Sequence, residues 1–290
     1  MSELSRRLSG ALSASGYPIE PCDNRLTPLS EKVKLLQDKG RYTRLISDLF
    51  AANDSANLRS LVLEVTFAFH FENADKPLQY EVTRRSEDAT SVDFLRQITS
   101  GEELYIEMRL VQQRQALTDL FEAQLRDSHY FGTTLDGVAD RAETLRLQRI
   151  ILSKAINKRG KLIKFQPNTP RSCNIVAVEV SEIHLGMPDD NDCLLATYGD
   201  RSVPDFARRQ IFGLFQEPRP EYPPHIHEIA ETFAPFREAV HAVLFLRKIR
   251  LKSLFAFDLE YILIHNPKLM TDNQADTIGL EFKQAMDVWR

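Results

Sequence analysis

A change of hydrophobic period between residues 57 and 111 constrains the fold more than any other feature of this sequence. Residues 57–73 (NLRSLVLEVTFAFHFEN) are apolar on nearly every side, which predicts a buried helix. Residues 103–111 (ELYIEMRLV) instead alternate between apolar and polar positions, which is typical of a strand with two different faces. Residues 91–98 form a second apolar run, and Gly101 lies between the two runs. The segment therefore predicts a buried helix and, further along the chain, a β-hairpin.

The remaining patterns predict alternating helices and strands. Further helices are expected at 31–40, 41–52, 115–127, 140–160, 227–236 and 274–289. Ser30 and Gly40 are the expected cap and stop of the first of these. Further strands are expected at 79–86, 172–183, 239–249 and 259–267. This order predicts an α/β fold with a mixed central sheet flanked by helices.

The chain divides into two expected parts. Residues 1–56 read as a helical N-terminal extension, and residues 57–290 as one α/β domain. Residues 186–235 look irregular, with a proline-rich insertion around 215–225 that we expect to be a surface loop.

Composition limits the cellular setting. No run approaches the roughly 18 apolar residues of a membrane-spanning helix, so no membrane partner is expected. Three widely spaced cysteines and an N-terminus without an apolar signal core favour a reducing, cytoplasmic location. A formal net charge of −4 argues against a general nucleic-acid coat but is compatible with a local basic groove.

Two carboxylates are predicted to meet on the polar face of the hairpin. Asp93 lies near the start of the first strand, whereas Glu107 and Arg109 share one face of the second. Magnesium is usually bound by one or two carboxylates together with waters and substrate phosphate. A neighbouring cation would neutralise charge that develops on a phosphoryl group. The hairpin is therefore a candidate site for a divalent metal.

These residues also carry a family resemblance. The run SVDF, a turn, and YIEMR resembles the PDF…(I/V)ExK signature of the PD-(D/E)XK restriction-endonuclease-like superfamily. In that family a helix with a glutamate commonly precedes the first motif, where this chain has Glu64, and a helix and a strand follow. The resemblance covers about residues 57–185.

By this resemblance, Asp93 and Glu107 would bind Mg²⁺ or Mn²⁺, and Glu64 would be an auxiliary ligand or position a water. Arg109 stands where the family has lysine, and arginine stays protonated and cannot act as a base. The resemblance implies hydrolysis of nucleic-acid phosphodiesters, of DNA rather than RNA, in restriction, repair, mobile-element or phage-defence systems. Many members form homodimers.

Alternatives remain open at this stage. A degenerate, non-cleaving member would bind nucleic acid or a protein partner, as an immunity protein does. Glu64 could equally form a structural salt bridge with an arginine. His225 and His227 suggest zinc only weakly, and the default is an exposed loop.

A basic cluster follows the predicted helix at 140–160. It is a candidate nucleic-acid contact, although helix ends often carry solvated cations. The cluster consists of Lys154, Lys158, Arg159 and Lys161, with Lys164 close behind.

Overall fold

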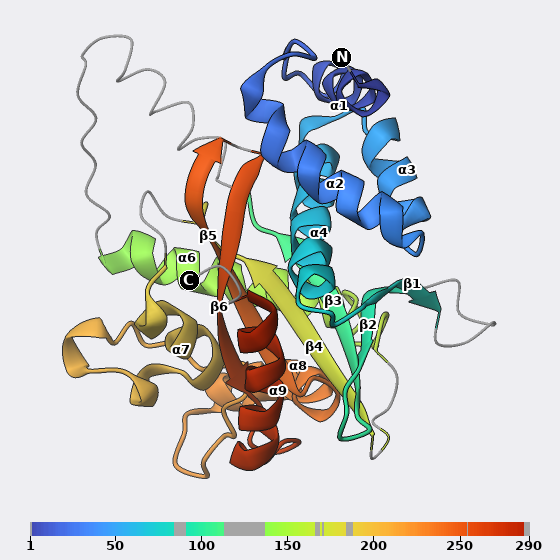
Figure 1. The fold of residues 1–290 in the computed structure, drawn as a ribbon. Helices are drawn as coiled ribbons and strands as arrows, with labels where there is room; N and C mark the ends of the chain where they lie inside the picture. Colours follow the sequence, from blue (N-terminus) through green and yellow to red (C-terminus); the bar gives the residue numbers. More distant parts are fainter. Residues whose placement is uncertain are drawn as a thin grey trace, which may run out of the picture.

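The computed structural model (Figure 1) describes most of the chain, and all that follows refers to that part. The described residues are 2–83, 91–112, 137–165, 169, 171–183, 188–253 and 255–286, without the side chains of 137–140 and 252. The helix expected at 115–127 lies outside them.

A six-stranded mixed sheet forms the centre of the molecule, in the order β1-β2-β3-β4-β5-β6. The strands are β1 (Gln79–Thr83), β2 (Ser91–Gln97), β3 (Glu103–Leu110), β4 (Ser172–Glu179), β5 (Ala242–Ser253) and β6 (Ala256–His265). The β3–β4 and β4–β5 pairs are parallel, whereas the pairs at both edges are antiparallel. The predicted α/β fold with a mixed sheet is confirmed.

Helices cover both faces of this sheet. One apolar core joins α4 (Ser55–Asn73) and α9 (Asp272–Met286) to one face, through residues such as Phe67, Phe94 and Phe282. The other core joins α6 (Gly137–Ala155), α7 (Asp190–Tyr198) and α8 (Pro224–Ala239) to the opposite face. Every residue of β4 is buried, as its continuous apolar run predicts for a strand covered on both sides.

The predicted helical N-terminus is present. It comprises α1 (Glu3–Ala14), α2 (Thr27–Lys39) and α3 (Thr43–Ala51), which gather at one end of the molecule beside α4 (Figure 1). Their buried leucines belong to the same core as α4 and the sheet. Gly40 ends α2 in the left-handed conformation, as predicted, with φ of 73°. The predicted start at Ser30 is wrong, because α2 begins at Thr27, with a proline in its first turn.

Residues 186–235 contain more structure than their composition indicates. Helix α7 begins at a capping box in which the side chains of Asp189 and Asp192 each accept a hydrogen bond from the other's backbone N–H. Helix α8 begins at Pro224, so His225 and His227 lie on a helix and not in the expected loop. The stretch from Glu217 to Pro223 lies outside helices and strands, as predicted for the proline-rich insertion. None of the described helices has both the length and the apolar character needed to cross a membrane.

Candidate functional site

Glu107 is a fully buried carboxylate in the middle of the sheet. It lies on β3, opposite Val176 of the neighbouring β4. An ionised carboxylate at such a position requires compensating partners, because burial strips its hydration. Its surroundings therefore decide what the site can do.

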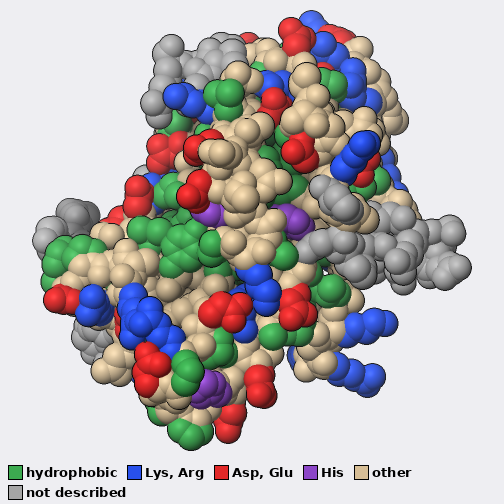
Figure 2. Space-filling model, turned by 90° about the horizontal axis from the view of Figure 1, so that it is seen from below, with side chains coloured by type: hydrophobic (Ala, Val, Ile, Leu, Met, Phe, Trp, Pro, Cys, Tyr) green, Lys and Arg blue, Asp and Glu red, His purple; other side chains and the backbone are tan. Residues whose placement is uncertain are grey.

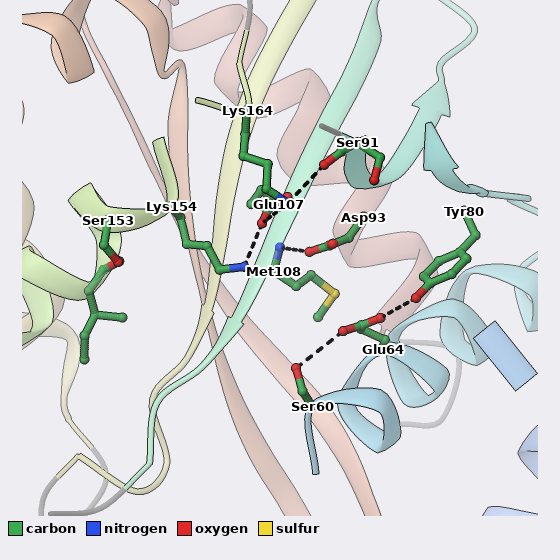
Figure 3. A network of polar contacts seen from close by, with 11 residues as sticks. Ser60, Glu64, Tyr80, Ser91, Asp93, Glu107, Met108, Ser153, Lys154 and Lys164 are labelled. Carbon is green, nitrogen blue, oxygen red and sulfur yellow. Dashed lines mark hydrogen bonds and ion pairs between the residues drawn. The ribbon is translucent and has the colours of Figure 1, made fainter. Parts of the chain in front are cut away.

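Asp93 reaches β3 directly beside Glu107. The backbone N–H of Met108 donates a 2.6 Å hydrogen bond to Asp93 Oδ2 (Figure 3). On the other side, the β1–β2 pairing skips Asp93, where Glu81 has a left-handed φ of 49°. Burial, and secondly the charge of Glu107, raise the pKa of Asp93 to about 6.

Glu64 approaches the same site from α4. Its carboxylate accepts hydrogen bonds from the Tyr80 hydroxyl at 3.0 Å and from the Ser60 hydroxyl at 3.4 Å (Figure 3). Burial, followed by the charge of Asp93, raises the pKa of Glu64 to about 8. Among the residues that the structure describes, no arginine forms a salt bridge with Glu64, and the two hydroxyl groups hold its carboxylate.

Two lysines neutralise Glu107. Lys154 Nζ lies 2.6 Å from Glu107 Oε1, and Lys164 Nζ lies 3.1 Å from the same oxygen. Lys164 also donates to the Ser91 carbonyl at 3.0 Å, which ties it to the start of β2. Both ammonium groups are therefore directed at the carboxylate that the family resemblance identifies as a metal ligand.

A local turn brings these two lysines together. Helix α6 packs Leu147, Ile151 and Ala155 against the sheet at four-residue spacing, which orients Lys154 in its last turn. The chain then reverses: the Asn157 side chain accepts hydrogen bonds from two following N–H groups, and Gly160 adopts φ of 73°. The Gly160 conformation is one that L-residues rarely adopt.

The other cations predicted for the site lie elsewhere. Arg109 is exposed, and its side chain makes no hydrogen bond or ion pair with a described residue. Lys158, Arg159 and Lys161 are exposed on the turn after α6. Lys154, which the sequence places with these phosphate-binding candidates, belongs to the Glu107 cluster instead.

Sequence reasoning missed Ser60 and Tyr80, and it placed Lys164 in the basic cluster without indicating its contact with Glu107. Ser60 was predictable in principle, because it precedes Glu64 by one helical turn. Tyr80 and Lys164 reach the site only through strand pairing and the turn after α6. No spacing in the sequence indicates either contact.

The donor set fits one hard divalent cation. The Oε2 atom of Glu107 is buried and has no hydrogen-bond partner, so a carboxylate oxygen remains available beside Asp93. Among the described residues, no group of three or more His, Cys, Asp or Glu side chains is arranged to hold a metal. A pair of carboxylates nevertheless matches magnesium, which commonly keeps several waters. The same chemistry disfavours zinc, whose closed sites take four nitrogen or sulfur ligands.

The molecular surface carries no large region of one charge on the face in Figure 2, where basic and acidic side chains are interspersed. On this face, the distribution leaves only local groups for contact with a polyanion. Comparisons with protein-family models, with curated proteins and with solved structures found no match to this chain.

Proposed function

We propose that this protein is a divalent-metal-dependent nuclease of the PD-(D/E)XK type, which hydrolyses phosphodiesters of DNA. One observation carries the proposal: a fully buried glutamate, Glu107, has one oxygen held by two lysines and the other without a partner. Burying such a carboxylate costs folding free energy, whereas its oxygen without a partner is a suitable ligand for a cation.

The element order supports the proposal. A helix with a glutamate (α4) precedes three antiparallel strands, and a helix (α6) leads to a parallel strand (β4). This is the sequence of elements that the family resemblance implies around the two motifs.

Each residue has a chemical role in the proposed reaction. Asp93 and Glu107 hold Mg²⁺ or Mn²⁺, and the Met108 N–H fixes the orientation of Asp93. A cation held by these two residues would supply Lewis-acid polarisation of the phosphoryl group and a coordinated water of lowered pKa. Glu64, whose pKa is near 8, holds a proton on its carboxyl group close to this site. Lys154 supplies the positive charge that stabilises the phosphate as negative charge develops on it.

Lys154 removes the main objection to activity. Arg109 occupies the position of the family lysine but is exposed and forms no ion pair with the described acidic residues of the cluster, whereas Lys154 reaches Glu107 from α6. The ammonium group beside Asp93 and Glu107 therefore comes from α6 and not from β3, the strand that carries Glu107. We include Lys158, Arg159 and Lys161 as backbone-phosphate contacts, since all three are exposed. A cytoplasmic location and a homodimer are part of the proposal.

A cleavage assay tests the function. Plasmid, linear duplex and single-stranded DNA, and RNA, are incubated with the protein in Mg²⁺, in Mn²⁺ and in EDTA. We expect metal-dependent cleavage of DNA that Glu107→Gln abolishes. The matched control is Glu231→Gln, an exposed glutamate on α8, which should cleave like the wild type.

The degenerate alternative gives a different result. A folded protein that binds DNA but cleaves none of the substrates would establish a binding module and contradict the nuclease. Cleavage that persists in Glu107→Gln would place the activity outside this site.

A further inference from the structure

A pocket on the far side of α6 is separate from the Glu107 site. It has a volume of about 560 Å³ and lies between α6, the loop after α7 and α8. Its apolar walls are formed by Leu145, Leu152, Phe212, Ile226, Ile229 and Phe233. This volume lies within the range of small-molecule sites, roughly 300–1,000 Å³.

Hydrogen bonds hold the pocket floor in place. The Gln148 side chain donates to the carbonyls of Ala196 at 2.9 Å and Phe212 at 2.8 Å. Gln216 accepts from the Gly213 N–H at 3.0 Å and donates to the Tyr222 hydroxyl at 3.0 Å. The backbone of Phe212 and the hydroxyl of Tyr222 are therefore held without a ligand, and the two rings meet edge to face with their centroids 6.2 Å apart.

Three exposed arginines, Arg141, Arg149 and Arg201, line the same pocket, and no carboxylate of the described residues lies within ion-pair distance of any of them. Arg201 lies over the ring of Tyr222, 5.6 Å from its centre. Asp200 also lines the pocket, but its carboxylate accepts the Arg209 backbone N–H at 2.9 Å.

Neighbouring arginines differ in this respect. Arg209 pairs with Asp192 at 2.5 Å and Arg146 with Glu143 at 2.9 Å. Within the described part of the chain, these two arginines have carboxylate partners, whereas the three that line the pocket have none. An apolar, aromatic wall beside uncompensated guanidinium groups suits a ligand with a flat ring and an anionic group.

We propose that this pocket binds a free nucleoside monophosphate. The base would pack against Phe212, Tyr222 and Phe233, because aromatic faces accept any flat ring. The phosphate would meet Arg149 and Arg201, since the guanidinium fork matches phosphate oxygens. The proposal does not depend on the nuclease assignment, although α6 carries both Leu152 of the pocket and Lys154 of the site.

Calorimetric titration with AMP, GMP, CMP and UMP tests the proposal. The full chain is used in EDTA, so that the Glu107 site binds no metal. We expect at least one nucleotide to bind with a Kd below about 1 mM. The corresponding nucleoside and inorganic phosphate should each bind at least about tenfold more weakly, because each retains only half of the contacts.

Variants locate the binding. Arg149→Ala and Arg201→Ala should each weaken binding about tenfold or more, and Ile229→Trp should block it from the exposed edge of the pocket. Glu107→Gln and Arg6→Ala, an exposed change on α1, should bind like the wild type.

Three outcomes would overturn the proposal. They are no binding of any of the four nucleotides at millimolar concentration, binding that Ile229→Trp leaves unchanged, and inorganic phosphate binding as tightly as the nucleotide.

Discussion

Two fully buried glutamates on adjacent parallel strands, Glu107 of β3 and Glu179 of β4, have opposite surroundings. Each has a lysine nearby, with Lys248 Nζ 3.2 Å from Glu179 Oε2. Glu179 Oε1 also accepts the Ser181 N–H at 2.8 Å. The two carboxylates are equally buried and each contacts a lysine. They differ in the other charged groups that surround them.

Around Glu179 the charges balance. Lys248 also contacts Glu182 at 3.0 Å, and Arg59 of α4 forms a salt bridge with Glu182. Two carboxylates thus face two cations. Burial raises the pKa of Glu182, but the hydrogen bond from Arg59 and the charge of Lys248 outweigh it and leave that pKa lowered.

Around Glu107, three carboxyl groups share two lysines. The pKa of Glu64 is raised to about 8 and that of Asp93 to about 6, so near neutral pH Glu64 keeps its proton and the two lysines face the carboxylates of Asp93 and Glu107. Ionisation of the third carboxyl group costs stability unless a cation from outside the chain balances it. The two clusters therefore differ in whether every carboxyl group ionises against a cation of the chain, and not in burial alone.

The largest expected effect is on stability at the balanced cluster. Lys248→Met leaves Glu179 buried without its cation, so we expect a loss of about 3–5 kcal/mol in the free energy of unfolding. Lys154→Met should cost less than half of this, because Lys164 still contacts Glu107. Chemical denaturation of both variants measures the difference, and equal losses would contradict the comparison.

The next effect is on the proposed cleavage. Lys154→Met should reduce the rate by about 10²–10³-fold, the usual cost of losing one group that stabilises developing charge. Arg109→Met is the matched control and should retain most of the activity, because Arg109 does not contact the acid cluster. If Arg109→Met lost more activity than Lys154→Met, Arg109 and not Lys154 would be the residue that stabilises the phosphate.

The pH dependence of stability should have opposite signs at the two clusters. Glu64 has a raised pKa, so its contribution to stability is complete below about pH 4.5 and is lost as the pH rises through about 8. Glu64→Gln, which stays neutral, should therefore match the wild type at pH 5 and exceed its stability at pH 8.5, by on the order of 2–3 kcal/mol.

Glu182 provides the contrast. Its pKa is lowered, so its contribution is present above the unfolded pKa and is lost as the pH falls. Glu182→Gln should be less stable than the wild type at pH 8.5. Thermal melts of both variants at the two pH values measure these differences, and the same sign at both clusters would contradict the assignment.

The smallest expected effect is stabilisation by magnesium. At 10 mM Mg²⁺ and a Kd of about 1 mM, linkage predicts about 1.4 kcal/mol of added stability. Thermal melts should show a higher midpoint in the wild type and in Glu182→Gln, but not in Glu107→Gln. A rise in all three proteins would indicate binding elsewhere.

Local patterns were sufficient for most of the fold. In three segments the spacing of apolar residues fits only one type of element. These are the hairpin at 91–111, the buried strand at 172–183 and the apolar helix at 57–73. The pattern failed at α7, where apolar residues do not form a clear stripe and the capping box at Asp189 was the only local signal.

The candidate site was predictable only in part. The alternation of the hairpin was enough to propose that Asp93 and Glu107 meet, because strand geometry places them on facing strands. The partner of Glu64 was not predictable, since a buried glutamate accepts from a hydroxyl or an arginine equally well. The cation was misplaced for a related reason: Arg109 is near Glu107 along the chain, whereas Lys154 is near it in space.

By itself, this sequence determined the elements, their order and the acid pair on the hairpin, because periodicity and short turns act over a few residues. Only the tertiary structure decided which cations reach that pair, which oxygen of Glu107 stays without a partner, and that Glu179 is balanced. These outcomes depend on contacts between α6, α4 and the sheet, where the burial that sets the energy of a charge is a property of the packed molecule.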